Sequence, residues 1–203
     1  MRHHYLLTVL RLPGNIEADL ARLQRLIFSW TGAASSQAFP PIVPLAGSEL
    51  PGDALPDGPP DGRPEGEIPS TPAAASPPTR LPEPLVLGRP RRRAATLCLD
   101  TGLEREPPPG SVFPAGVEDA CLRVLLAVLP GRATGACPDE PQADLADDEA
   151  SQMTDDLRDA WESAAGAATV TVRRVWEERW LVSTAGDPWW CSVDWRVEHR
   201  RAL

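Results

Sequence analysis

The first part of the chain alternates hydrophobic and polar positions and then changes to a helical period. Residues 4–12 alternate and are rich in Leu, Val, Tyr and Thr, which predicts a buried strand. A Pro-Gly-Asn sequence then interrupts the pattern, and Asn15 is a favourable helix N-cap. Gly32 is a natural C-cap. Between these two caps a helix is predicted, because apolar residues recur at helical spacing: Ile16, Leu20, Leu23, Ile27 and Trp30.

A proline-rich segment follows a short apolar stretch. Residues 39–46 contain β-forming residues separated by prolines, which predicts an edge strand at best. Half of the 24 prolines lie between residues 47 and 90, in a region without aromatic residues. Such a composition cannot bury enough apolar surface to offset the entropy of ordering, so residues 47–90 are expected to form a disordered insert. Two loose Pro-x-x-Pro matches, at 56–59 and 69–72, are best interpreted as chance in so proline-dense a segment.

Beyond the insert, the pattern predicts a strand and two helices. An arginine cluster at residues 89–93 precedes an apolar run at 94–100, which predicts a strand flanked by solvated basic residues. Residues 117–129 place apolar side chains on one side of a second amphipathic helix. A third helix is predicted over residues 153–165, because negative charge in its first turn suits the helix dipole. Residues 130–150 between these helices are expected to be an acidic loop.

The C-terminal part has the clearest β pattern. Residues 168–175 alternate, residues 179–184 form a second run, and a turn precedes a last strand over 189–197. That strand is expected to place Trp189, Cys191, Val193, Trp195 and Val197 on one face. Five of the seven tryptophans lie in this part of the chain, and tryptophans at strand spacing more often cover a core than form a base-stacking platform.

Composition and charge exclude several classes of function. The chain has 203 residues, enough for one domain or two small lobes. All 20 basic residues are arginine, so no lysine is present to form a Schiff base or to serve a phosphate loop. The formal net charge of −9 opposes general coating of a nucleic acid, although a local arginine site stays open.

The cysteines indicate a reduced, cytoplasmic protein. Cys98, Cys121, Cys137 and Cys191 are far apart and contain no Cys-x-x-Cys pair, so they are interpreted as reduced thiols and not as a disulfide frame or a zinc site. The N-terminal apolar run is too short for a secretion signal, and no stretch approaches the length of a membrane span.

Metal and acid–base chemistry find little support in the sequence. The acidic residues of 130–150 lack the alternating ligands, central glycine and terminal glutamate of a calcium loop, so no metal is expected. An enzyme using carboxylates of the 139–159 region is the least supported hypothesis, because no spacing there sets out an acid and a base. The three histidines, His3, His4 and His199, lie close to the termini and are interpreted as solvated.

The order of elements resembles the 2H phosphoesterase superfamily, whose best-known branch is the 2′-5′ RNA ligase-like proteins. Residues 5–13 resemble the first strand of that family, which ends in a proline. Residues 15–32 resemble its first long helix, and residues 170–197 resemble its paired C-terminal strands. These pieces cover roughly half of the chain, and none of them is specific alone.

The specific signature of that family is a pair of His-x-Thr/Ser motifs that face each other across a cleft. One imidazole removes a proton and the other delivers one, on opposite sides of the phosphorus atom. The first motif normally reads Pro-His-x-Thr-Leu, and the matching stretch here is residues 41–45, with Ile42 at the histidine position and Pro44 at the hydroxyl position. The second motif is absent too, because no histidine occurs between His4 and His199.

The resemblance therefore implies an α+β fold of two ferredoxin-like lobes with antiparallel sheets and a catalytically degenerate cleft. The expected organisation is a domain split into residues 1–46 and 91–203 by the insert at 47–90. The implied role is binding, either of a nucleotide or RNA end or of a protein partner, with no cofactor, metal or membrane. The alternative is an interaction protein that uses the proline-rich insert or the tryptophan-bearing C-terminal hairpin.

Overall fold

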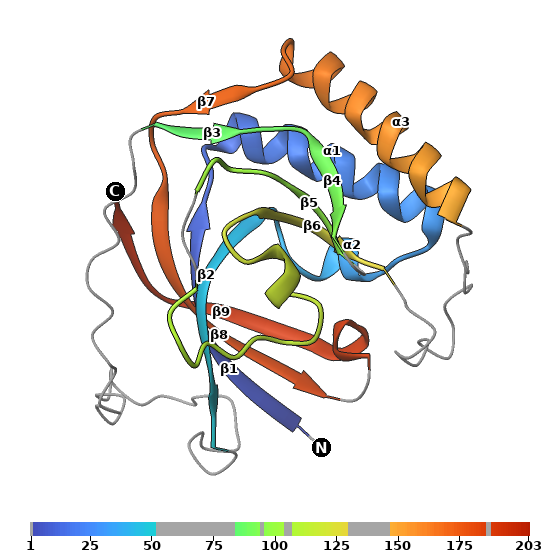
Figure 1. The fold of residues 1–203 in the computed structure, drawn as a ribbon. Helices are drawn as coiled ribbons and strands as arrows, with labels where there is room; N and C mark the ends of the chain where they lie inside the picture. The colour runs from blue at the N-terminus through green and yellow to red at the C-terminus, as the bar shows by residue number, and fades with distance from the viewer. Residues whose placement is uncertain (1, 52–83, 94–95, 104–106, 130–146, 186–187) are drawn as a thin grey trace.

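The structure is a computed structural model that describes residues 2–51, 84–93, 96–103, 107–129, 147–185 and 188–203. Its helices are α1 (Gly14–Thr31), α2 (Ser35–Ala38) and α3 (Asp147–Ala165), with short 3-10 turns η2 (Glu118–Ala120) and η3 (Trp189–Ser192). Its strands, coloured along the chain in Figure 1, are β1 (Arg2–Arg11), β2 (Ile42–Leu50), β3 (Leu85–Leu87), β4 (Pro90–Arg93), β5 (Thr96–Leu99), β6 (Val124–Val128), β7 (Val170–Val172), β8 (Trp176–Ala185) and β9 (Val193–Ala202).

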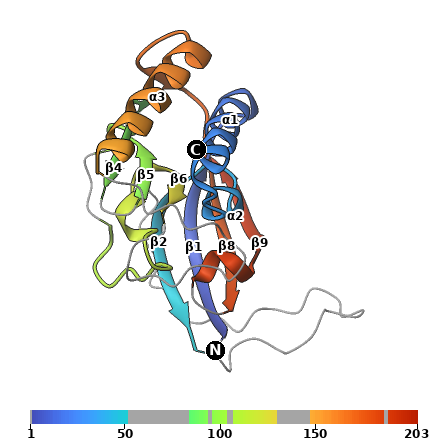
Figure 2. The same cartoon turned by 90° about the vertical axis from the view of Figure 1, so that its right-hand side faces the viewer.

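One antiparallel sheet organises the described part of the chain. Its strand order is β4-β5-β6-β2-β1-β8-β9, and β3 pairs with β7 in a separate two-stranded sheet. The N-terminal strand β1 lies inside the large sheet, where it pairs with β2 on one side and with β8 on the other. Figure 2 shows this sheet from β4 at one edge to β9 at the other. The α+β class with antiparallel strands is thereby confirmed.

Two hydrophobic cores lie on the two faces of this sheet. Neighbouring residues of a strand point to opposite faces, and accordingly Val43 belongs to the first core and Ile42 to the second. Helices α1 and α3 pack against each other over the first core (Figure 1), to which they contribute Leu20, Leu23, Ile27, Leu157 and Trp161. The second core contains Phe39, Trp180, Val182, Trp189 and Trp190.

The first strand and helix form as the periodicity predicts, with one difference at the helix start. The helix begins at Gly14 with Pro13 as its N-cap residue, so Asn15 is not the cap. The carbonyl of Pro13 accepts the backbone N–H of Glu17 at 2.9 Å, and the fixed φ of proline suits this position. Gly32 ends the helix in the left-handed conformation, at φ 70°. The third predicted helix is also confirmed and is longer than expected, because α3 begins at Asp147.

The predicted edge strand is instead an interior strand of the sheet. Strand β2 lies between β1 and β6 and continues to Leu50, so residues 47–50 belong to the sheet and not to a disordered insert. Pro44 is tolerated because the β2–β6 ladder is confined to Ile42 and Leu125. Beyond that pair, the carbonyl of Pro44 accepts the backbone N–H of Leu122 at 2.8 Å, and on its other side the β1–β2 register shifts at this point, between Thr8 and Val9, an irregularity of the kind at which proline is found in sheets.

The far end of the predicted insert is also ordered. Strand β3 and the start of β4 fall within residues 84–90, where Leu85 and Leu87 are buried. Residues 52–83, which include both Pro-x-x-Pro matches, lie outside the described residues.

The prediction of a helix over residues 117–129 is wrong. The segment forms the single turn η2 and then strand β6, all five residues of which are buried. A strand covered on both faces has a continuous apolar sequence, and periodicity alone cannot distinguish such a run from a buried helix.

The last predicted strand begins later than expected. Trp189 and Trp190 lie in η3 and are both buried, while Cys191 is exposed, so the expected alternation starts only at Val193. The interpretation of the tryptophans as core residues is confirmed for Trp180, Trp189 and Trp190. The two ferredoxin-like lobes are not confirmed, because β1, β2, β5, β6 and β8 belong to the same continuous sheet.

Candidate ligand pocket

The two positions that the resemblance aligns with the first motif, Ile42 and Pro44, lie inside the protein. Ile42 is fully buried in the second core and pairs with Leu125 of β6. Pro44 is buried too and lies opposite Val9 of β1. Neither side chain faces solvent, so this segment of β2 acts as a packed strand of the sheet.

The histidines lie elsewhere. In the ladder of β1 and β2, His4 pairs with Leu50 at one end and Arg11 pairs with Ile42 at the other, which separates His4 from Ile42 by about 23 Å along the strand. Nδ1 of His3 contacts a carboxylate oxygen of Glu49 at 2.7 Å. His199 lies on β9 opposite Arg179 of β8 and is exposed. The structure therefore brings no imidazole to the motif position.

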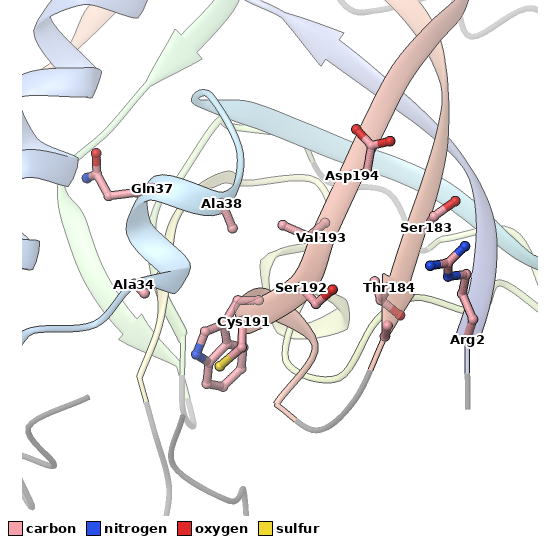
Figure 3. A pocket seen from close by; sticks show the side chains of 12 residues that line it. Arg2, Ala34, Gln37, Ala38, Ser183, Thr184, Cys191, Ser192, Val193 and Asp194 are labelled. Carbon is pink, nitrogen blue, oxygen red and sulfur yellow. The ribbon is translucent and has the colours of Figure 1, made fainter. Parts of the chain in front are cut away.

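A pocket of ≈ 560 Å³ lies at the end of the β8–β9 hairpin, shown close by in Figure 3. Its walls come from β1, α2, β8, η3 and β9, elements that are far apart in the sequence. The lining combines charged groups, hydroxyls, an amide and an indole: Arg2, Ala34, Gln37, Ala38, Ser183, Thr184, Ala185, Trp190, Cys191, Ser192, Val193 and Asp194. These side chains offer charges and hydrogen-bonding groups to a small polar ligand.

The aromatic side chains of η3 hold one wall of the pocket in place. Trp189 donates its indole N–H to the carbonyl of Ala115 at 2.8 Å and stacks on Phe39 at a centroid distance of 5.3 Å. Trp190 meets Trp189 edge to face at 5.6 Å. A wall fixed by two buried indoles requires little ordering when a ligand binds, which favours affinity.

The charged lining consists of one cation and one anion, Arg2 and Asp194. Both residues are exposed, and within the described part of the chain neither forms an ion pair. Ser183 lies on the strand between them, and its hydroxyl oxygen shares a hydrogen bond with Nδ1 of His4 at 2.9 Å. The pocket thus offers charge and hydroxyl groups to a ligand, without a metal shell.

The cysteines are not the four reduced thiols that the sequence predicts. Cys98 and Cys121 are free and buried, and burial raises the pKa of each thiol to about 11. Such thiols are protonated and unreactive near neutral pH. Cys191, at the pocket, is disulfide-bonded, which corrects the prediction for this residue. Cys137 lies outside the described residues.

The other candidate sites offer no comparable arrangement. The arginines before β5 are partly paired, since Arg91 contacts Asp100 at 2.7 Å and Arg89 contacts Glu162 at 3.1 Å. Most of the predicted acidic loop, residues 130–146, lies outside the described residues. On α3, Asp155 pairs with Arg158 at the surface.

Across the described ranges, no group of three or more His, Cys, Asp and Glu side chains could hold a metal ion. The helices of these ranges also include none that is long and apolar enough for a bilayer span.

The residues of this pocket carry no local signal in the sequence. Arg2, Gln37 and Asp194 stand in no motif, and only the strand register and the position of α2 bring them together. No family model matches the chain, and neither a curated protein nor a solved structure matches it. The pocket and its chemistry therefore provide the basis for a functional proposal.

Proposed function

We propose that this protein binds a small anionic ligand, such as a nucleotide-like phosphate, without catalysing its conversion. The observation that carries the proposal is that Arg2, which forms no ion pair with another described residue, lines the same pocket as Ser183 and Ser192. A guanidinium group offers a planar fork of N–H donors that matches a phosphate or carboxylate, and hydroxyl groups add further hydrogen bonds. The volume of the pocket falls within the range of small-molecule sites.

The residues at the motif positions argue against the two-histidine mechanism of the family that the sequence resembles. Isoleucine carries no transferable proton and proline has no N–H or hydroxyl to donate, and both side chains are packed in the sheet. A two-histidine mechanism needs two imidazoles near one phosphorus atom. His4 lies at the opposite end of the β1–β2 ladder from Ile42, so it does not supply an imidazole at that position.

We also propose that the protein is a divergent member of the 2H phosphoesterase superfamily that lacks its two histidines. This part of the proposal rests on the sequence resemblance. The arrangement of β1, α1 and the C-terminal hairpin β8–β9 is consistent with it. The continuous seven-stranded sheet lends no support to two separate lobes. The binding role stands on the pocket and is independent of that ancestry.

The test is a titration of the full-length chain with inorganic phosphate and adenosine monophosphate, followed by calorimetry at low salt. The Arg2→Gln variant is expected to weaken binding about fivefold or more, because it removes a charge-assisted contact. Arg25→Gln is the matched control, since Arg25 is an exposed arginine of α1 that does not line the pocket. Equal affinity of wild type and Arg2→Gln would contradict the proposal.

A second assay tests the absence of catalysis. Cyclic phosphodiesters and 2′-5′ linked nucleotides are expected to remain intact when incubated with the purified protein. Turnover that scales with protein concentration and survives repurification would overturn the non-catalytic assignment.

The alternative role as a protein-interaction module has less support in the structure. Trp180, Trp189 and Trp190 of the C-terminal hairpin are buried and offer no docking platform. The central part of the proline-rich insert, residues 52–83, lies outside the described residues. A deletion that tests this role has to spare the end of β2, all of β3 and the first residue of β4, which the boundaries 47–90 would have removed.

A further inference from the structure

Three polar side chains project from the same face of neighbouring strands at the pocket. In the register of the sheet, Arg2 of β1 pairs with Ala185 of β8, and Asp194 of β9 pairs with Ser183 of β8. Ala185 and Ser183 are two residues apart and therefore point to the same face. Figure 3 shows the side chains of Arg2, Ser183 and Asp194 on these three strands.

The two ends of this row carry opposite charges that no other described side chain compensates. Arg2 and Asp194 are exposed, and neither has a side-chain hydrogen bond or an ion pair to another described residue. Other charges of the β8–β9 hairpin are paired: Arg196 contacts Glu198 at 2.5 Å, and Arg201 contacts Glu177 at 2.8 Å. The lining of the pocket thus contains one cation, on β1, and one anion, on β9, neither of which pairs with another described residue.

The strand geometry keeps these two charges from neutralising each other. Adjacent strands lie about 4.8 Å apart and residues rise about 3.4 Å along a strand. Because β8 separates β1 from β9 and the two positions are offset by two residues, their Cα atoms are on the order of 12 Å apart. A ligand that spans part of this distance can contact both groups, with the hydroxyl of Ser183 between them.

We propose that the ligand of this pocket is an elongated zwitterion, with an anionic group that pairs with Arg2 and an amine that pairs with Asp194. This inference rests on the proposed binding function and narrows its ligand class. A ligand with an anion alone would place its charge in the field of the Asp194 carboxylate, and a cation alone would meet the guanidinium of Arg2. A zwitterion of matching length satisfies both groups at once, and its two contacts act as linked binding events.

The experiment uses linear ω-amino acids as probes of the untagged full-length protein. Binding of 6-aminohexanoate is compared with that of hexanoate and hexylamine, which each retain one charge, and with that of glycine, which retains both charges at short spacing. By calorimetry or NMR titration at low salt, we expect 6-aminohexanoate to bind about fivefold more tightly than each of the other three, as for an additional exposed ion pair.

Substitutions of the two exposed residues then test which charged group of the ligand each residue binds. Asp194→Asn is expected to reduce the affinity for 6-aminohexanoate to that for hexanoate and to leave hexanoate binding unweakened. Arg2→Gln is expected to weaken the binding of both. Asp159→Asn on α3 is the control, because Asp159 is exposed and does not line the pocket. Thermal denaturation of each variant verifies that the fold is intact.

The outcomes separate this inference from the function on which it rests. If hexanoate binds as tightly as 6-aminohexanoate, or if Asp194→Asn has no effect, the zwitterion proposal is overturned while an Arg2-dependent anion site stands. If phosphate, hexanoate and 6-aminohexanoate all fail to bind at millimolar concentration, both proposals are overturned.

Discussion

Glu178 accepts the indole N–H of Trp180, two residues further along β8, at 2.7 Å. The carboxylate of Glu178 is almost completely buried, and Nε of Arg200 lies 2.6 Å from its other oxygen. Arg11 of β1 approaches the same carboxylate at 4.0 Å and stacks over the ring of Trp180. A single buried carboxylate thus connects β1, β8 and β9 on the face that carries the second core.

Replacing Glu178 with alanine is expected to lower the free energy of unfolding by about 3 kcal/mol or more. The loss follows because two arginines and an indole N–H keep their donors and lose the buried acceptor. Urea denaturation measures the effect. Asp155→Ala is the control, since its ion pair with Arg158 is exposed and is expected to contribute less than about 1 kcal/mol. Similar losses in the two variants would contradict the structural role of Glu178.

Introducing a His-x-Thr sequence at residues 42–44 is expected to destabilise the protein without creating an enzyme. The double variant Ile42→His and Pro44→Thr places an imidazole and a hydroxyl in a buried part of β2. Burying polar groups without partners costs roughly 1–3 kcal/mol each. Thermal denaturation and a cyclic phosphodiester assay check the two parts. Ile42→Val, which retains an aliphatic side chain, is expected to cost about 1 kcal/mol, and a stable, active double variant would show that Ile42 lines an open site.

A methyl group at Gly47 is expected to disrupt the junction between β2 and the segment that covers it. A Cβ atom there would lie 2.2 Å from the carbonyl oxygen of Val112 and 2.9 Å from a methyl carbon of Leu7. We expect Gly47→Ala to lower the free energy of unfolding by about 2 kcal/mol, as for overpacking in a core. Gly14→Ala is the matched control, because no atom lies within 4 Å of the added methyl group and alanine favours a helix. Equal free energies of unfolding for the two variants would show that the segment around residue 47 is not tightly packed.

The stability of the protein is expected to fall as the pH rises from about 9 to about 11. Burial raises the pKa of Cys98 and of Cys121 to about 11, whereas an exposed thiol in the unfolded chain ionises near 9. The folded state therefore holds more protons than the unfolded state in this window, so a rising pH favours unfolding. Urea denaturation between pH 8 and pH 10.5 measures how steeply the free energy of unfolding falls with pH. When each protein is compared with its own value at pH 8, this fall is expected to be smaller in Cys98→Ala than in the wild type. An unchanged slope in that variant would exclude the Cys98 thiol as a contributor.

The disulfide of Cys191 is expected to be detectable by thiol counting. Because Cys98 and Cys121 are free and buried, the native protein should react with a thiol reagent slowly at pH 8. In denaturant without reductant the count is expected to be lower than after reduction, and a non-reducing peptide map should show the Cys191 peptide linked to another cysteine. An equal thiol count in both denatured samples would restore the prediction of reduced cysteines.

Protein isolated under thiol-trapping conditions also tests the cytoplasmic location that the sequence predicts, since disulfides are rare in that compartment.

Local sequence patterns predicted those helices and strands that bury only one face. Helix α1 has one buried stripe and a glycine at its end, so its period and its C-terminus follow from the sequence. Strand β6 was missed because both of its faces are buried, which removes the alternation that marks a strand. The prolines around residue 44 favoured an edge strand, and only the end of the β2–β6 ladder at Ile42 shows why an interior position tolerates Pro44.

What the sequence determined by itself is therefore helix α1, a helix over residues 153–165, the alternating first strand, and the absence of imidazoles from the Pro41–Leu45 frame. The tertiary structure decided that Ile42 is a core residue and that Arg2 and Asp194 lie in one pocket on opposite sides of β8. The reason is that periodicity and capping act between residues a few positions apart, whereas strand order and register join residues almost two hundred positions apart, and no local preference encodes that pairing.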